Sequence, residues 1–200
     1  MVEKKAKLET TKIKVMLEGV APFLFNKFID HSKEVRPVEQ KFYIDTDGSL
    51  VLPSENIDAF LWGKDPRGCA KVIEGVKSDD YLKVGMGHVF VDPILIPFLD
   101  EKEKPIMVPK NIAKDKRFGI VMSGGRTRAS SGSNSIKQEA QPRPYLKTPW
   151  LLIFTLTLIK NKQFDVVKLD NWFNEGGLTV ALGAWRTKFG RFMVKEWKVV

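Results

Sequence analysis

The 200-residue sequence has few of the residues that form covalent or metal cross-links. It contains one cysteine, Cys69, and two histidines, His31 and His88. One cysteine cannot form a disulfide within the chain, and the thiol and imidazole ligands are too few for the usual four-ligand zinc sites. We therefore expect no metal and no other cofactor, and we expect Cys69 to be a small packing residue.

Long apolar runs are also missing. No stretch reaches the ~18 apolar residues that a membrane-spanning helix needs, and no apolar segment of signal-peptide length follows the charged residues 1–12. These absences predict a cytoplasmic protein that does not enter a membrane. The hydrophobic content of 43% is enough for a sizeable core and excludes disorder throughout, and residues 1–200 fit a single domain with a large insertion.

Positive charge is abundant and unevenly distributed. The net charge is +9, from 33 Lys and Arg against 24 Asp and Glu. Residues 110–147 hold nine basic and two acidic residues, and the last twenty positions hold five basic residues and one acidic residue. Clustered cations release counterions from a polyanion, whereas a merely soluble surface needs no clustering. The distribution therefore favours an anionic partner.

The pattern of apolar residues predicts a mixture of strands and helices. Strands are predicted at residues 12–20, 42–44, 50–52, 81–99, 150–159 and 192–199, with 150–159 central in a sheet and a hairpin turn at 45–48. Helices are predicted from an N-cap at Ser54 to Gly63, with a continuation through 69–73, and from Asp165 towards Leu182. Hairpins without regular βαβ alternation indicate an α+β domain on a largely antiparallel sheet.

Residues 123–135 contain abundant Gly and Ser and almost no apolar side chains. Such a segment cannot offset the entropy of ordering by burial, so we expect a mobile loop within a basic, flexible insertion at about 110–147. Arg126 and Arg128 in this loop are typical of an arm that becomes ordered when it contacts a nucleic-acid strand. The alternative is an inert surface linker.

The strongest candidate site is the glycine-containing segment 176–192 before the last predicted strand. Its cations suit phosphates, and Trp185 and Phe189 offer faces for base stacking. In the alternative interpretation Gly183 caps a helix and both aromatic residues lie in the core, which we favour for Phe189. The predicted nucleic-acid-binding residues are Lys110, Lys116, Arg117, Arg126, Arg128, Lys137, Arg143, Trp185, Arg186, Lys188 and Arg191.

Catalytic chemistry has little support in the sequence. His31 beside Asp30 is the one candidate acid–base pair, and it lacks an identifiable nucleophile or second partner. Asp45 and Asp47 are explained more simply by a hairpin turn than by a metal loop. We therefore expect no enzyme, with a metal-independent ribonuclease centred on His31 as a minor alternative. Another alternative is a structural or assembly protein, of a phage or a multi-subunit complex, whose cations meet an acidic protein partner.

Two segments resemble a known family. Residues 50–57 (Leu-Val-Leu-Pro-Ser-Glu-Asn-Ile), followed by an amphipathic helix, and the loop at 183–192 are similar to motifs of the RAMP superfamily, the RNA-binding proteins of CRISPR effector complexes. The resemblance implies a ferredoxin-like or RRM-like core with helices on one face and a thumb-like insertion, for which 110–147 is the counterpart. It also implies binding of single-stranded RNA and polymerisation along the strand, and a phage or mobile-element relative with the same fold would show the same resemblance. We therefore expect single-stranded RNA or DNA as the partner, together with further copies of the chain or other complex subunits. The terminal region has no histidine, which argues against the RNA-cleaving branch of the family.

Overall fold

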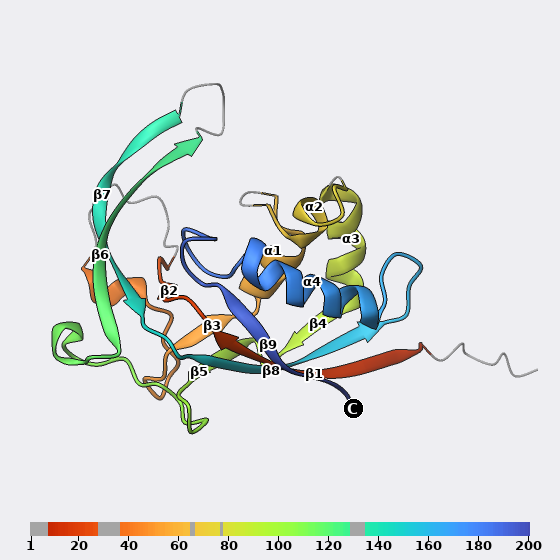
Figure 1. The fold of residues 1–200 in the computed structure, drawn as a ribbon, viewed down its shortest axis with the longest axis horizontal. Helices are drawn as coiled ribbons and strands as arrows, with labels where there is room; N and C mark the ends of the chain where they lie inside the picture. The colour runs from red at the N-terminus through yellow and green to blue at the C-terminus, as the bar shows by residue number, and fades with distance from the viewer. Residues whose placement is uncertain (1–7, 28–36, 65–66, 77, 129–134) are drawn as a thin grey trace, which may run out of the picture.

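The computed structural model describes residues 8–27, 37–64, 67–76, 78–128 and 135–200 (Figure 1). Within these ranges, residues 78–80 and 123–140 are described by their backbone alone. The described part of the chain contains two antiparallel sheets and four α-helices.

The larger sheet has six antiparallel strands. They are β1 (Thr10–Gly19), β3 (Val51–Pro53), β4 (Val89–Asp92), β5 (Leu95–Leu99), β8 (Leu151–Ile159) and β9 (Phe192–Val199). Their order is β3-β5-β8-β1-β9, and β4 also pairs with β8. Strand β8 pairs with β1 along its whole length, from Leu151 opposite Glu18 to Ile159 opposite Thr10. The predicted central position of this strand is confirmed.

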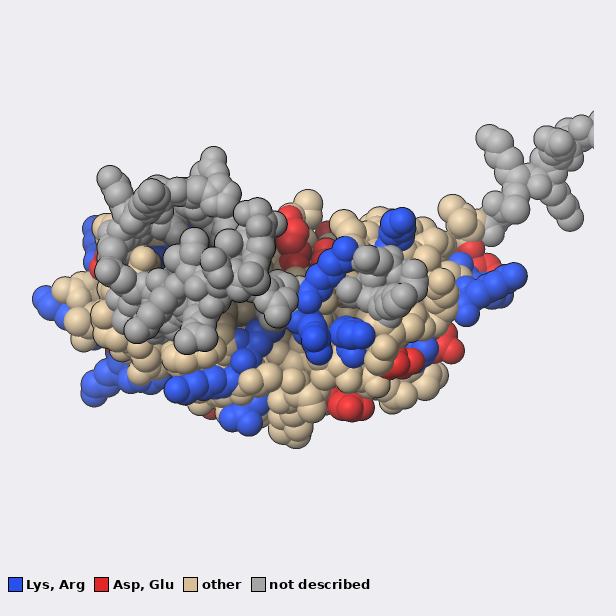
Figure 2. Space-filling model, turned by 90° about the horizontal axis from the view of Figure 1, so that it is seen from above, with Lys and Arg blue, Asp and Glu red and all other residues tan. Residues whose placement is uncertain are grey.

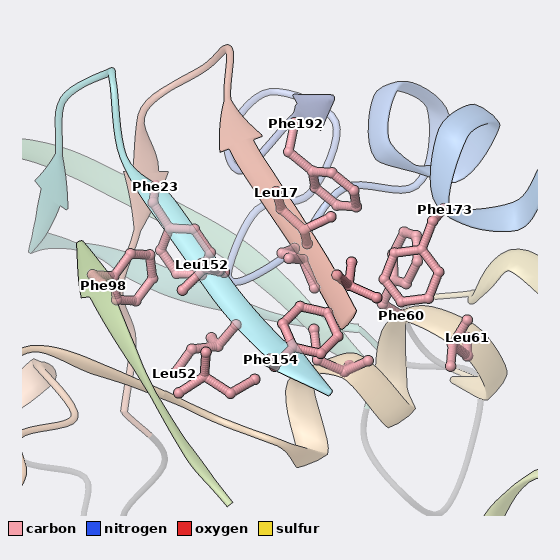
Figure 3. Packing of buried hydrophobic residues seen from close by; sticks show 14 of the residues in the cluster. Leu17, Phe23, Leu52, Phe60, Leu61, Phe98, Leu152, Phe154, Phe173 and Phe192 are labelled. Carbon is pink, nitrogen blue, oxygen red and sulfur yellow. The ribbon is translucent and has the colours of Figure 1, made fainter. Parts of the chain in front are cut away.

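The helices lie on one face of this sheet (Figure 1). They are α1 (Glu55–Trp62), α2 (Cys69–Val72), α3 (Ser78–His88) and α4 (Val166–Thr179). The alternation predicted for β1 directs Ile13, Val15 and Leu17 towards the helices, where all three are fully buried. Figure 3 shows Phe60 of α1 and Phe173 of α4 against the sheet residues, with ring centroids 5.2 Å apart.

The smaller sheet is a long hairpin with one short strand added. It has the order β2-β7-β6, from β2 (Phe23–Leu24), β6 (Phe118–Arg128) and β7 (Ser135–Leu146). The hairpin extends away from the main sheet and curves towards the side on which the helices lie (Figure 1). Two short 3-10 helices, η1 (Val38–Lys41) and η2 (Ile112–Lys114), flank its base. Lys41 is fully buried and its Nζ donates to the Pro142 carbonyl at 2.6 Å, which ties η1 to β7.

Two sequence predictions are wrong. Residues 81–88 belong to helix α3, not to a strand, because Gly85 lets the helix pack directly on Trp62: a Cβ there would lie 2.5 Å from the indole ring. Residues 123–128 and 135 belong to paired strands instead of a loop, with Arg126 opposite Lys137 in the register. The tip of the hairpin, 129–134, lies outside the described residues. This polar segment has few apolar side chains to bury, and antiparallel backbone hydrogen bonds hold it in two strands instead.

Other predictions are confirmed, with one difference in detail. The 45–48 turn is present, with Ile44 bridged to Leu50, and Asp165 caps α4 by accepting from the Lys168 amide at 2.9 Å. Helix α1 begins where Ser54 predicts, but the Ser54 side chain makes no capping bond, because Ser54 itself has helical backbone angles. Cys69 is fully buried, as expected of a packing residue, and burial raises the pKa of its thiol.

Candidate nucleic-acid interface

The loop between α4 and β9 has a backbone that local sequence alone would not favour. Gly183 and Gly190 have positive φ angles, as do the non-glycine residues Ala181, Trp185 and Thr187, at 64°, 51° and 69°. Each non-glycine residue in the left-handed region costs about 1–3 kcal/mol, so the rest of the fold must hold the loop. Ala181, and not Gly183, takes the left-handed position just after α4, so the Gly183 cap of the alternative interpretation is absent.

Hydrogen bonds to the segment around β2 hold this loop. The Ala184 amide donates to the Leu24 carbonyl at 3.2 Å, and the Gly190 amide donates to the Pro22 carbonyl at 2.8 Å. A Cβ on Gly190 would lie 1.9 Å from the carbonyl oxygen of Leu182, so this position needs glycine for close approach as well as for its φ of 71°. The loop is therefore a fixed structure that presents its exposed side chains in one arrangement.

An aromatic ring and a cation are paired on the outside of the loop. Trp185 is 44% exposed, and the Nζ of Lys188 lies 4.7 Å from the centroid of its ring. Arg191 is also exposed, and neither Lys188 nor Arg191 makes an ion pair within the described residues. Phe189 is buried, as predicted. An exposed indole beside unpaired cations has the two properties used to bind single strands, a stacking surface and positive charge.

Arg186 differs from the exposed phosphate ligand that the sequence predicts. Its side chain turns inward, where Nη1 donates to the carbonyl of Ala59 in α1 at 3.1 Å. Its Nε is buried with no hydrogen-bond partner in the described part of the chain, and burial lowers the pKa of the guanidinium. The side chain fixes the loop to α1, which leaves Lys188 and Arg191 as the outward cations of this segment.

The base of the hairpin lies against the same loop. Tyr145 of β7 covers Gly119 of β6, where a Cβ would lie 2.3 Å from the phenol ring, and its ring centroid is 6.2 Å from that of Phe189. Arg143, two residues along β7, is part-buried, and burial lowers its pKa. Its Nε has no partner among the residues that the structure describes. The structure thus brings the C-terminal loop and the hairpin base together, although they are far apart in sequence.

The cations before the hairpin are arranged differently. Arg117 makes a two-point ion pair with Asp115, with Nη2 to Oδ2 at 2.7 Å and Nε to Oδ1 at 3.1 Å, which lowers the pKa of Asp115. Lys110 and Lys116 are exposed. Arg117 is therefore already neutralised by an acid and is a weaker candidate for phosphate contact than the sequence predicts.

The remaining predicted cations lie along the hairpin strands. In the register, Arg126 is opposite Lys137 and Arg128 is opposite Ser135, so the backbone carries all three basic positions towards the far end of the hairpin. Figure 2, seen from the side of the helices, shows Lys and Arg side chains gathered near the middle of this face, with Asp and Glu more scattered. The basic face therefore extends beyond the C-terminal loop.

Sequence reasoning missed the role of two aromatic residues. Tyr145 joins the two segments, and Tyr43 has the Nζ of Lys27 at 5.8 Å from its ring centroid. The sequence does contain a signal for Tyr145, because it lies between Arg143 and Lys147, and alternating basic and aromatic residues are typical of surfaces that bind single strands. No such signal marks Tyr43, because Lys27 is distant in sequence.

The described residues hold no group of three or more His, Cys, Asp and Glu side chains that could bind a metal ion. His31 lies outside the described residues, and His88 Nδ1 contacts the Val84 carbonyl at 2.8 Å, one helical turn earlier in α3. Within the described chain, no helix has both the length and the apolar character needed to span a bilayer.

Comparison with known proteins gives a structural likeness. No protein-family profile matches the sequence, and no curated protein matches it significantly. The fold is similar to that of one chain in the "Cryo-EM structure of the Type III-B Cmr-beta bound to cognate target RNA", with a TM-score of 0.56 over 96% of this chain at 11% sequence identity. The match covers 61% of that neighbouring chain. At such low identity the likeness shows a common fold and nothing about individual residues.

Proposed function

We propose that this protein binds single-stranded RNA without catalysing a reaction, as a RAMP-like subunit arrayed along the strand in a ribonucleoprotein complex. The observation that carries the proposal is the exposed Trp185–Lys188 pair on a rigid loop that packs, through Phe189 and Tyr145, against the base of a basic hairpin. Stacking on Trp185 and phosphate contacts from Lys188 and Arg191 would act together on one strand.

The strand order supports a ferredoxin-like core. Without the short elements β2, β3 and α2, the helix α3 and the hairpin, the remaining α-helices and strands run β1, α1, β4 with β5, β8, α4 and β9, and the sheet order is β9-β1-β8 followed by β5 and β4. This reduced order matches the βαββαβ pattern with antiparallel neighbours and so supports the proposed ferredoxin-like core. Helices α1 and α4, the two crossover helices, both lie on the same face (Figure 1).

The structural neighbour supports RNA as the ligand. The neighbouring chain belongs to a complex bound to cognate target RNA, and the likeness extends over nearly all of this chain. The same likeness supports the proposed role inside a multi-subunit complex.

Fluorescence-anisotropy titration tests the proposal directly. Labelled single-stranded RNA, single-stranded DNA and duplex would each be titrated with the protein at 50 mM and 200 mM salt, concentrations between which a multi-contact complex weakens by orders of magnitude. We expect binding to the single strands, RNA most tightly, that weakens steeply with salt, and RNA that stays intact during the incubation.

Two results would contradict the proposal. Failure to bind any single strand at 50 mM salt, together with stable oligomers free of nucleic acid, would favour the assembly protein with an acidic protein partner. Cleavage of the RNA that disappears in a His31→Ala variant would show that the protein is a ribonuclease.

A further inference from the structure

A cavity of about 190 Å³ opens where the segment after β2, the start of α1 and the C-terminal loop meet. Its walls are mainly aromatic and aliphatic, with side-chain amides at two places. The lining residues are Phe23, Leu24, Phe25, Asn26, Tyr43, Leu52, Asn56, Gly183 and Ala184. Figure 3 shows that Phe23 and Leu52 also belong to the buried core, so the apolar wall of the cavity is part of the rigid fold.

The two side-chain amides of the cavity have hydrogen-bonding capacity to spare within the described part of the chain. The Asn56 Nδ2 donates to the Pro53 carbonyl at 3.3 Å, which orients the amide. Neither the Asn56 Oδ1 nor the Asn26 amide has a hydrogen-bond partner within the described part of the chain, and both residues are part-buried. Amides combine donors and acceptors, so they complement the edges of nucleobases, which also carry both.

The size of the cavity limits its occupant. Pockets for drug-sized ligands occupy about 300–1,000 Å³, so this cavity is too small for a dinucleotide. A volume of this size suits one planar ring such as a nucleobase. Proteins that bind single strands commonly take an unstacked base between aromatic or apolar side chains and hydrogen-bond its edge.

The cavity is continuous with the candidate interface. Ala184 lines it and directly precedes the exposed Trp185, and the bond from the Ala184 amide to the Leu24 carbonyl fixes that part of the wall. At the side of Tyr43, the Nζ of Lys27 lies 5.8 Å from the ring centroid. A base stacked on Trp185 would therefore lie next to the wall of the cavity, and the neighbouring base of the same strand would be within reach of it.

We propose that this cavity receives a single unstacked nucleobase of the bound strand, held against Tyr43 and hydrogen-bonded by Asn56. The proposal rests on the proposed RNA-binding function and adds to it a discrete base site. An adjacent base would then stack on Trp185, so the strand would bend between the two positions and these two bases would not stack on each other.

Photo-cross-linking identifies the base site independently of the binding register. An oligouridine in which every residue is 4-thiouridine would be bound, irradiated and digested, and the cross-linked peptides mapped by mass spectrometry. We expect cross-links at Tyr43 and at Trp185. Cross-links confined to Trp185 or to the hairpin, with normal affinity, would overturn the base site and leave the RNA-binding proposal standing. Absence of RNA binding by the unmodified protein would remove both.

Two variants test the cavity by affinity. Ala184→Leu fills it and should weaken RNA binding by about fivefold or more, the loss expected for one stacked base, with loss of the Tyr43 cross-link. As a control, Gln163→Leu places a leucine at an exposed position in the β8–α4 turn. It should change neither the RNA affinity nor the Tyr43 cross-link. Because Ala184→Leu could also disturb the loop, Asn56→Ala provides a second test that leaves the loop unaltered. A twofold or smaller effect of both cavity variants, with the Tyr43 cross-link retained, would overturn the proposal.

Discussion

The ring centroids of Tyr145 and Phe189 lie 6.2 Å apart, and this contact joins the β7 strand of the hairpin to the loop that precedes β9. Tyr145 is placed by the absence of a side chain on Gly119, and Phe189 is placed by a loop with several left-handed residues. The two most basic parts of the sequence therefore meet through aromatic packing at the base of the hairpin.

The first prediction concerns this contact. Tyr145→Ala removes the ring that lies between Gly119 and Phe189, so the free energy of unfolding should fall by about 2 kcal/mol, less than the about 3–5 kcal/mol for a fully buried aromatic residue. Tyr145→Phe keeps the ring contact and should stay within about 0.5 kcal/mol of the wild type. Urea denaturation followed by circular dichroism measures both. Equal stability of the Ala and Phe variants would show that the contact contributes nothing.

Trp185 carries the second prediction. Trp185→Ala removes the exposed stacking surface and should reduce the affinity for single-stranded RNA by about 1–3 kcal/mol, while leaving stability nearly unchanged because the ring is 44% exposed. Trp185→Phe keeps an aromatic face and should retain most of the affinity. Anisotropy titrations at one salt concentration compare the three proteins. If Trp185→Ala bound RNA as tightly as the wild type, stacking on this ring would be excluded.

A pair of glycine substitutions tests the shape of the loop. Gly190→Ala places a Cβ 1.9 Å from the Leu182 carbonyl oxygen at a φ of 71°, so we expect a loss of stability of about 1–3 kcal/mol and weaker RNA binding. Gly87→Ala lies in α3 with no atom within 4 Å of the added carbon and should stabilise by about 0.5–1 kcal/mol. Thermal melts and titrations of both variants provide the readout. Unchanged RNA binding by Gly190→Ala would contradict a functional role for this loop conformation.

The fourth prediction is a pH dependence. The Trp172 indole donates to Glu74 at 3.0 Å and Lys168 pairs with it at 3.2 Å, and these bonds lower the pKa of Glu74 below its ordinary value of 4.5. A carboxyl group with a lowered pKa in the folded state stabilises the fold above the unfolded-state pKa, and this contribution is lost as the pH falls through the folded-state pKa. Denaturation at pH 7 should therefore show Glu74→Gln to be less stable than the wild type.

The difference between wild type and Glu74→Gln should disappear in strong acid, where protonated Glu74 and Gln are alike. Denaturation at pH 7 and at pH 2.5, below the ordinary carboxyl range, measures this change. A difference that stays constant between the two conditions would mean that the ionised state of Glu74 is not what stabilises the contact between α4 and the segment after α2.

The sequence correctly predicts the strands and helices in which apolar residues recur at regular spacing because one face of the element is buried. Ile13, Val15 and Leu17 alternate because a single face of β1 is buried, and the strong strand signal of β8 marks the strand that pairs with β1 on one side and with β4 and β5 on the other. Helix α3 could not be predicted from the sequence, because glycine is unfavourable inside a helix. The reason for Gly85 is its contact with Trp62, which lies 23 positions earlier in the sequence. The long hairpin strands are held by backbone hydrogen bonds, and these produce no pattern of apolar residues in the sequence from which the strand length could be predicted.

The candidate site was likewise only partly predictable from the sequence. The exposure of Lys188 and Arg191 and the burial of Phe189 follow from composition and spacing, and both are found. The inward direction of Arg186 depends on a carbonyl of Ala59, 127 residues away, and the pairing of Arg117 depends on how Asp115 leaves η2. The first contact is set by tertiary structure and the second by local backbone geometry, so a list of basic residues overestimates the number that face a ligand.

The most direct measurement is the salt dependence of single-stranded RNA binding for a double charge reversal of the C-terminal loop. Lys188→Glu/Arg191→Glu should weaken binding at every salt concentration and flatten the slope of log affinity against log salt by about 1.4, from about 0.7 for each lost phosphate contact on a single strand. Lys162→Glu is the control, since Lys162 is exposed in the β8–α4 turn at the end of the molecule away from the hairpin (Figure 1). It should keep the wild-type slope. Equal slopes for the double variant, the control and the wild type, with all three folded, would contradict an RNA interface built on this loop.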